Sequence, residues 1–162
     1  MDVAWRKGLA PEELTVEWTQ AVQKLFLEGT GEQYFAGSIQ SLPVPRWEGN
    51  LMLFDSVEET PQSMRGLLWT TPFKEDTVRI VSFVLDPGSR NKGWGSQAWN
   101  ILSESLAGTQ YTTIQLEVRS TNEKAINFYR KRGLEVIQEL YGYYSSGIGY
   151  LMRGPLQTIN PQ

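Results

Sequence analysis

The sequence contains no cysteine and no histidine. Without cysteine, the chain can form no disulfide, no thiolate metal site and no cysteine nucleophile. Without histidine, it lacks both the commonest general base and the commonest metal ligand. A Ser-His-Asp hydrolase is therefore excluded, and we expect no metal cofactor. Any acid–base chemistry falls to Glu, Asp, Lys, Tyr, a chain terminus or water.

Long apolar runs and an excess of basic residues are also missing. No apolar run approaches the roughly 20 residues that span a bilayer, and residues 1–15 lack the apolar core of a signal peptide. The net charge of −3 provides no basic surface for nucleic acid. We therefore expect a cytoplasmic protein that binds neither membrane nor nucleic acid. Its 162 residues, 40% of them hydrophobic, predict a single domain over residues 1–162 with one core.

The spacing of apolar residues predicts an α/β protein with one mixed sheet. Helices are expected at 12–28, 95–108 and 120–133, and strands at 51–57, 65–73, 77–86, 112–119, 134–144 and 148–156. Segment 38–50 contains two prolines and is typical of a strand or a loop, which gives the order α-β-β-β-β-α-β-α-β-β. Gly29 and Gly31 should end the first helix, while Ser120 and Glu123 have the spacing of a capping box for the last one.

The start of the middle helix, in the stretch SRNKGWGSQAW, is costly for a helix. Gly93 and Gly95 each cost roughly 1 kcal/mol relative to a good helix former, and Lys92 stands beside the positive end of the helix dipole. A bound phosphate would offset both costs, because backbone amides at a helix start attract anions and Arg90 adds positive charge. The alternative is a tight turn that uses glycine only for positive φ.

Two other phosphate-binding patterns fit this stretch less well. A P-loop requires Lys-Ser/Thr after its glycine, whereas Trp94 follows Gly93. The run GWGSQA satisfies the dinucleotide pattern G-x-G-x-x-A, with Glu117 as the candidate acid. However, residues 86–92 separate its first glycine from the preceding strand. A nicotinamide enzyme remains open as an alternative.

A third pattern fits at two places. RNKGWG (90–95) resembles the Arg/Gln-x-x-Gly-x-Gly/Ala signature of the GCN5-related N-acetyltransferases (GNAT), and LEVRSTNEKAINFYRKRGLEV (116–136) resembles their second coenzyme-binding motif. The resemblance implies a GNAT-like α/β domain, with a mostly antiparallel sheet flanked by helices, and acetyl-CoA as cosubstrate. It covers 77–153 as the coenzyme-binding and catalytic half. Residues 1–60 carry no family motif and are expected to form the acceptor side.

The resemblance also assigns residues to the coenzyme. In this family the strand before the loop pairs with the pantetheine arm, and the loop holds the pyrophosphate. The implied contacts are Phe83, Val84, Leu85, Arg90, Asn91, Lys92, Gly93, Trp94, Gly95, Ser96, Asn122, Ala125 and Tyr129. Asn122 has a second interpretation, as a helix-start residue that satisfies a free backbone amide.

The same family comparison suggests the catalytic groups. Tyr129 would protonate the coenzyme A thiolate, unless it is an ordinary core tyrosine. LEVR (116–119) resembles the branch that acetylates ribosomal-protein N-termini (alanine acetyltransferases), where the residue equivalent to Glu117 acts as base, usually through water. The alternative for Glu117 is an ion pair, for example with Arg119. Because cysteine is absent, direct transfer is favoured over an acyl-enzyme.

The acceptor is the least determined part. Tyr143 and Tyr144 resemble a tyrosine pair that lines the peptide channel in the N-terminal acetyltransferase branch, although such a pair is also a common packing device. We expect transfer to a primary amine, with a protein N-terminus as first choice. A small amine, a lysine side chain and a non-catalytic acyl-CoA-binding module are the alternatives. A homodimer is compatible with the sequence, which leaves the oligomeric state open.

Overall fold

The structure is a computed structural model that describes residues 3–142 and 147–157. The strands are β1 (Ala4–Lys7), β2 (Leu51–Phe54), β3 (Met64–Lys74), β4 (Thr77–Leu85), β5 (Thr113–Arg119), β6 (Glu135–Leu140) and β7 (Gly149–Pro155). The α-helices are α1 (Val16–Thr30), α2 (Ala36–Gln40), α3 (Trp94–Ser105) and α4 (Glu123–Arg130). Short 3-10 helices lie at Pro11–Glu13, Pro61–Ser63 and Pro87–Ser89.

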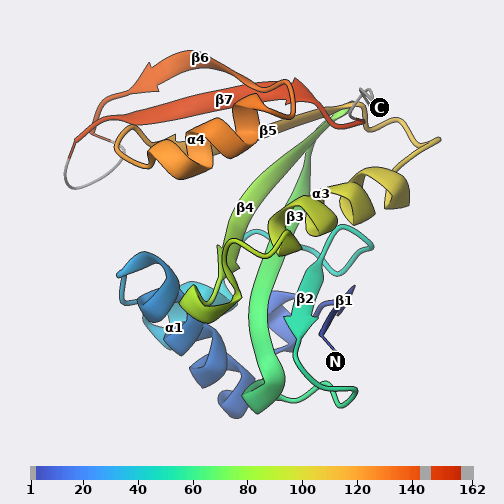
Figure 1. Cartoon of the computed structure of the whole chain (residues 1–162), viewed down its shortest axis with the longest axis vertical. Coiled ribbons are helices and arrows are strands. Elements are labelled where there is room, and N and C mark those ends of the chain that lie inside the picture. Colours follow the sequence, from blue (N-terminus) through green and yellow to red (C-terminus); the bar gives the residue numbers. More distant parts are fainter. Residues whose placement is uncertain (1–2, 143–146, 158–162) are drawn as a thin grey trace. The chain divides into compact units, whose positions relative to one another are not determined.

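The strands form one seven-stranded sheet in the order β1-β2-β3-β4-β5-β7-β6 (Figure 1). The pairs β1–β2, β2–β3, β5–β7 and β6–β7 are antiparallel, whereas β4 and β5 are parallel. The predicted fold class, an α/β protein with a mixed and mostly antiparallel sheet, is therefore confirmed.

The chain divides into two compact units. The first contains the described residues up to Thr71 together with Val81–Ser105, and the second contains Pro72–Ile80 with the described residues from Leu106 onward. Strands β3 and β4 contribute residues to both units. Among the described residues, no helix is long and apolar enough to cross a membrane.

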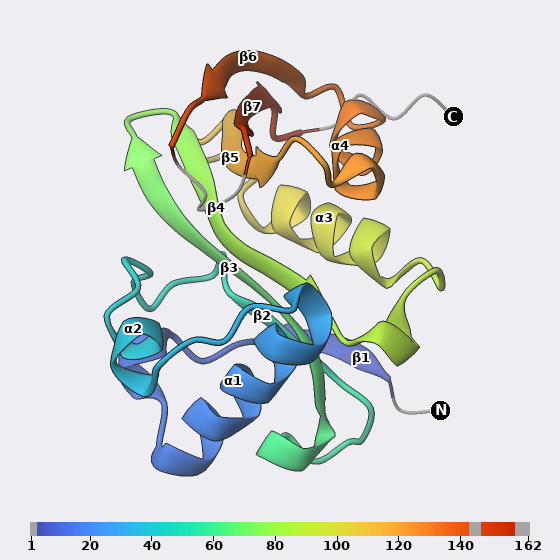
Figure 2. The same cartoon turned by 90° about the vertical axis from the view of Figure 1, so that its left-hand side faces the viewer.

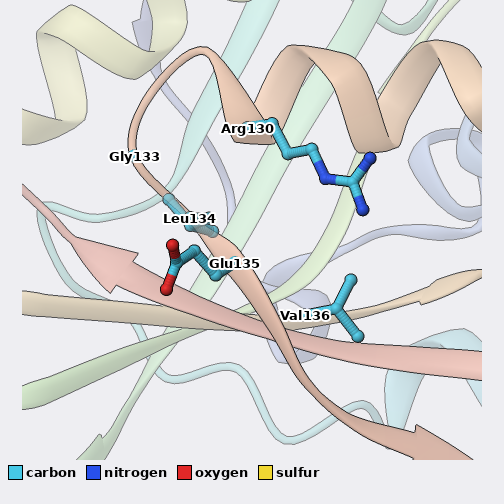
Figure 3. Close-up of a pocket in the computed structure, with 5 residues that line it drawn as sticks. All are labelled: Arg130, Gly133, Leu134, Glu135 and Val136. Atoms are coloured by element: carbon cyan, nitrogen blue, oxygen red, sulfur yellow. The ribbon is translucent and has the colours of Figure 1, made fainter.

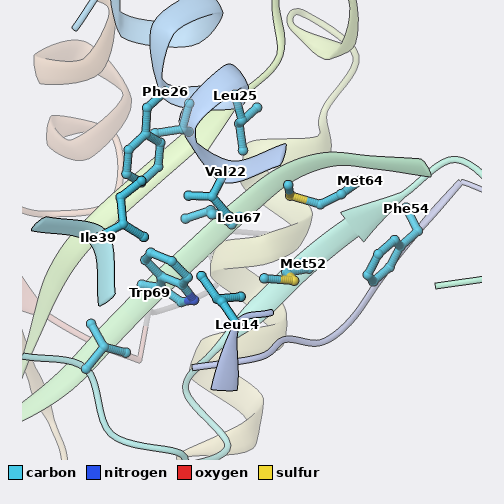
Figure 4. Packing of buried hydrophobic residues seen from close by; sticks show 12 residues of the cluster. Leu14, Val22, Leu25, Phe26, Ile39, Met52, Phe54, Met64, Leu67 and Trp69 are labelled. Carbon is cyan, nitrogen blue, oxygen red and sulfur yellow. The ribbon is translucent and has the colours of Figure 1, made fainter. Parts of the chain in front are cut away.

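The core of the first unit forms where α1 and α2 pack on β2 and β3 (Figure 4). Val22 and Leu25 of α1 and Ile39 of α2 are buried against Leu67 and Trp69 of β3. Because side chains alternate along a strand, the fully buried residue between those two β3 positions faces the other way. Figure 2 shows α3 on that other side of β3 and β4.

The second unit contains the first residues of β4, the strands β5, β7 and β6, and α4, which lies alongside β5 and β7 (Figure 1). The predicted alternation of β5 is correct for Ile114, Leu116 and Val118, which are all buried. The buried residues of α4 are Ile126 and Tyr129, three positions apart on one helix face.

The first sixty residues depart most from the prediction. The first strand is β1, not segment 38–50, which begins with the end of α2 and continues without regular structure. Helix α1 starts at Val16 because Thr15 caps it, accepting a hydrogen bond from the Trp18 amide at 3.3 Å. Gly29 does not end this helix but lies inside it, and Gly31 is the cap, with φ of 80°.

Three other expected boundaries are also wrong. The capping box of Ser120 and Glu123 does not form, because Asn122 is the cap of α4 and its Oδ1 accepts a hydrogen bond from the Ala125 amide at 3.2 Å. The strand expected over 51–57 ends at Phe54, and the one expected over 134–144 ends at Leu140.

Candidate functional site

The predicted phosphate loop lies in the first unit, between β4 and α3. After the short 3-10 helix, Asn91 has φ of 61° and Gly93 has φ of 84°. Helix α3 then begins, and the Gln97 amide donates to the Gly93 carbonyl at 3.1 Å. The first amides of a helix have no carbonyl partner within that helix, so the loop ends in donors suited to an anion.

Gly93 is required for its backbone conformation. A Cβ at this position would meet no atom within 4 Å, so space alone does not exclude a side chain, whereas positive φ disfavours one. Asn91 adopts the same left-handed region, which Asn tolerates better than most residues. The positive φ that the turn interpretation expects is present at Gly93, whereas Gly95 lies inside α3.

Three contacts hold this loop within the first unit. The Trp5 indole Nε1 of β1 donates to the Trp94 carbonyl at 2.8 Å, at the first residue of α3. The Asp86 amide donates to a β3 carbonyl at 2.8 Å. The Arg90 Nη2 donates to the Gly29 carbonyl near the end of α1. Arg90, predicted to contact the coenzyme, therefore also joins the loop to a helix terminus whose partial charge is negative.

The last residues of β4 are packed from two sides. A Cβ on Gly29 of α1 would lie 2.5 Å from the Val84 Cγ1 and 3.2 Å from the Leu85 carbonyl oxygen. A Cβ on Gly66 of β3 would lie 3.0 Å from the Val84 carbonyl oxygen. Of the three predicted pantetheine-binding residues, Val84 is buried, while Phe83 and Leu85 are half-buried. The end of β4 is therefore fixed by close approach of both neighbouring elements.

In the second unit, Glu117 of β5 is paired with Arg79 of β4. The Arg79 Nε donates to both carboxylate oxygens, at 3.1 and 3.2 Å, and its Nη2 donates to Oε1. The two side chains are 11% and 23% exposed, with Glu117 the more buried. An ion pair, the alternative interpretation of Glu117, is therefore present, and Arg79 is its partner.

Helix α4 carries the remaining predicted residues of the second unit. Asn122 is exposed at its start and serves as the helix cap, as its second interpretation proposed. Ala125 is half-buried and Tyr129 is 8% exposed. Ala125 and Tyr129, four positions apart, lie on one side of the helix, while Asn122 precedes its first residue.

Tyr129 lies beside an aromatic and a cationic group. Its ring packs edge-on against Phe128, with centroids 5.5 Å apart, and the Arg132 guanidinium carbon lies 3.6 Å from the centre of the Phe128 ring. Partial burial lowers the pKa of Arg132, and its electrostatic interaction with Tyr129 acts in the opposite direction. The buried tyrosine ring is thus held by its neighbours on the same turn.

Two hollows lie away from the predicted residues. One, of about 500 Å³ in the second unit, is lined by Arg130, Gly133, Leu134, Glu135 and Val136 (Figure 3). The other, of about 450 Å³ in the first unit, includes Trp18 and Phe54 in its lining. None of the predicted site residues that the structure describes lines either hollow.

The remaining predictions concern the two tyrosines on the acceptor side and the metal cofactor. Tyr143 and Tyr144, predicted to contact the acceptor, lie outside the described residues. Within the described part of the chain, no three acidic side chains gather closely enough to hold a metal ion.

Comparison with known proteins identifies the family. Residues 19–134 match the profile of the acetyltransferase (GNAT) family. The chain belongs to this family. Its membership confirms the resemblance carried by the two motifs and makes the chain a GNAT acetyltransferase, of a family that uses acetyl-CoA. Among curated proteins, no sequence matches it significantly.

Several solved structures share the GNAT fold over nearly the whole chain. Ard1 from Thermoplasma volcanium is 22% identical with a TM-score of 0.76, covering 96% of this chain and 98% of that one. The ribosomal-protein-S18-alanine N-acetyltransferase from Escherichia coli is 18% identical with a TM-score of 0.74, covering 99% and 97%. A chain of the NatC complex bound to Gag peptide and CoA is 18% identical with a TM-score of 0.76, covering 96% and 99%.

The GNAT fold excludes the dinucleotide interpretation. A dinucleotide-binding domain has a mostly parallel sheet and a glycine turn directly after its strand. Here β4–β5 is the parallel pair, and a 3-10 helix separates β4 from Gly93. Glu117, the candidate ribose ligand, lies inside β5 and is bound by Arg79.

Sequence reasoning missed three residues that hold predicted site residues in place: Arg79 in the second unit, and Trp5 and Gly29 in the first. Each acts through a partner distant in the sequence, namely Glu117, the start of α3 and the end of β4. The position of Gly29 inside a helical pattern was a usable signal, because an interior glycine there often marks a close packing contact. No local pattern marks Arg79 or Trp5.

Proposed function

We propose that the chain transfers the acetyl group of acetyl-CoA directly to a primary amine, with the N-terminal α-amine of a protein or peptide as its acceptor class. The observation that carries the proposal is the motif at 116–136. In the structure this motif places Glu117 on β5 and Tyr129 on α4, two consecutive elements of the second unit. These are the residue types that the proposed reaction needs as base and as acid.

The coenzyme is proposed to bind through the residues that the family motifs assign. The loop 90–96 would hold the pyrophosphate, because positive φ at Asn91 and Gly93 leads into the amides at the start of α3. The exposed Lys92 adds positive charge there. The backbone of Phe83–Leu85 would pair with the pantetheine arm. On α4, Asn122 and Ala125 would add contacts.

The chemistry requires two proton movements. The amine nitrogen attacks the thioester carbonyl carbon, the new C–N bond forms, and the C–S bond breaks. The Tyr129 hydroxyl gives its proton to the leaving thiolate. Glu117 takes the proton that the amine loses, directly or through a water molecule. Direct transfer is favoured over an acyl-enzyme, because the sequence offers no cysteine nucleophile.

The acceptor class rests on two further observations. LEVR (116–119) resembles the branch that acetylates ribosomal-protein N-termini, and one structural neighbour is a ribosomal-protein-S18-alanine N-acetyltransferase. Another neighbour was solved with a peptide and CoA. Residues 1–60, with Tyr143 and Tyr144, are proposed to form the acceptor side, and 77–153 the coenzyme-binding and catalytic half.

A matched acceptor panel tests this proposal. We would offer peptides with a free N-terminus and no lysine, the same peptides with a blocked N-terminus and one lysine, and small amines, each with acetyl-CoA. Mass spectrometry would locate the added acetyl group. Acetylation confined to free N-termini is expected. Acetylation of lysine or of small amines alone would reassign the acceptor, and coenzyme binding without any product would indicate a binding module.

A further inference from the structure

The contact between Arg79 and Glu117 lies where the β4–β5 ladder ends. The parallel pairing runs from Thr77 opposite Thr113 to Arg79 opposite Gln115. Glu117 is the next residue of β5 on the same face as Gln115. Arg79 therefore reaches past its direct partner to the first carboxylate beyond the paired segment.

The geometry of this contact is specific. A guanidinium that donates from Nε and Nη2 to one carboxylate fixes both the position and the plane of the carboxylate. The Arg65–Asp55 pair in the first unit is close but more exposed, at 38% and 37%, than Glu117 and Arg79 at 11% and 23%. Ion pairs are screened less by solvent as they become buried. The Arg79–Glu117 pair should therefore hold its geometry more tightly.

We propose that Arg79 is a positioning residue for Glu117 in the acetyl-transfer reaction, an inference that rests on the proposed function. Arg79 holds the Glu117 carboxylate in one position and one orientation, from which it can accept a proton. The proton lost by the attacking amine goes to Glu117, directly or through water. Arg79 keeps its own protons throughout and touches neither substrate.

The same sheet face supplies a control. Arg153 of β7 donates from Nε and Nη2 to the Gln115 Oε1, at 3.1 and 2.8 Å. It is a second cross-strand arginine contact, on the residue directly opposite Arg79, and it does not include Glu117. Loss of Arg153 should disturb this face of the sheet without releasing the carboxylate.

The test is a double-mutant cycle measured on activity. We would compare Arg79→Gln, Glu117→Gln, the double variant, Arg79→Lys and Arg153→Gln in steady-state assays, with acetyl-CoA affinity measured separately. Arg79→Gln is expected to lower kcat about tenfold or more, the scale of a lost charged hydrogen bond. Acetyl-CoA affinity should change little. In the Glu117→Gln background, the same substitution should cause no further loss, because its partner is already neutral.

The remaining variants distinguish positioning of Glu117 by Arg79 from a general contribution of Arg79 to the sheet. Arg79→Lys keeps the charge without the two-pronged geometry and should recover part of the activity. Arg153→Gln should stay within about twofold of the unmodified chain, because it leaves the Glu117 contact intact. Thermal unfolding of every variant identifies losses of activity that are due to misfolding. If Arg79→Gln does not fold, Arg79→Lys takes its place in the comparison.

Three results would overturn the inference. Equal losses from Arg79→Gln with and without Glu117, or equal losses from Arg79→Gln and Arg153→Gln, would each show that Arg79 does not act through Glu117. In both cases the proposed function would stand, because the unmodified chain would still turn over. An unmodified chain that binds acetyl-CoA but acetylates no amine would instead overturn the proposed function together with this inference.

Discussion

Tyr129 is the side chain on which the proposed chemistry depends most. It is 8% exposed on the inner face of α4, and its ring is held edge-on by Phe128. The ring of Tyr129 contributes to packing, while its hydroxyl is the group that the proposed chemistry uses. The substitution that removes only the oxygen separates these two contributions.

Tyr129→Phe should lower kcat by about 100-fold to 10,000-fold, the usual contribution of a general acid. The binding of acetyl-CoA should stay nearly constant, because the ring and its packing against Phe128 remain. Steady-state kinetics and equilibrium binding of the same preparation measure both quantities. Tyr111→Phe, which removes the hydroxyl of a half-buried tyrosine elsewhere in the second unit, is the control. Unchanged turnover in Tyr129→Phe would remove Tyr129 from the mechanism.

The site residues differ in how far the sequence predicts them. Tyr129 and Glu117 lie within one local motif, so their spacing alone predicts the helix and the strand that carry them. The partner of Glu117 could not be predicted in this way, since Arg79 is 38 positions away. Only the register of β4 against β5 brings the two together, and no local pattern encodes that register.

At the scale of elements, the contact between α1 and the end of β4 links the phosphate loop to the rest of the first unit. Gly29→Ala places a methyl group 2.5 Å from the Val84 Cγ1 and near the Leu85 carbonyl. Overpacking costs about 1–3 kcal/mol, which should outweigh the gain of up to about 1 kcal/mol from replacing a helical glycine. We expect a lower free energy of unfolding and weaker binding of acetyl-CoA.

Gly37→Ala is the matched control for that substitution. Gly37 also lies in a helix of the first unit, but an added Cβ there meets no atom within 4 Å. Its free energy of unfolding should stay equal or rise by up to about 1 kcal/mol. Chemical denaturation of both variants gives the comparison. If Gly29→Ala were as stable as Gly37→Ala and bound acetyl-CoA equally well, the close approach of α1 to β4 would affect neither stability nor coenzyme binding.

Asn122 offers a test of two roles at one helix start. Asn122→Ala removes the cap of α4 and should lower the free energy of unfolding by about 1 kcal/mol. Asn122→Ser keeps a capping oxygen but loses the amide, so its stability should be close to that of the unmodified chain. Calorimetric titration of the Ser variant with acetyl-CoA then isolates the coenzyme contact. Unchanged affinity in Asn122→Ser would leave Asn122 as a cap alone.

Helices and strands could be predicted where their apolar pattern repeats, over several turns of a helix or several residues of a strand. The apolar spacing of α1 and α3 and the alternation of β5 predicted these elements correctly to within a few residues. The four-residue β1 and the five-residue α2 are too short to show a period, and tertiary packing rather than local preference forms them. Caps also shift the boundaries of the longer helices: Thr15 sets the start of α1, and Asn122 sets the start of α4.

At the scale of the whole molecule, acetyl-CoA should stabilise the chain. A ligand at 100 times its Kd adds about 2.7 kcal/mol to the free energy of unfolding. Thermal unfolding with acetyl-CoA should therefore show a clear rise in Tm, whereas NADH should give none. Stabilisation by NADH but not by acetyl-CoA would contradict the coenzyme assignment drawn from the loop 90–96.

Release of coenzyme A is the measurement that tests the proposed transferase activity most directly. The chain would be mixed with acetyl-CoA and peptides bearing free N-termini, and free coenzyme A would be read with a thiol reagent. The chain contains no cysteine, so its own side chains add no background and slow turnover is visible. We predict release that depends on both the free N-terminus and Tyr129. No release with any amine, from a chain that acetyl-CoA still stabilises, would contradict acetyl transfer and leave coenzyme binding alone.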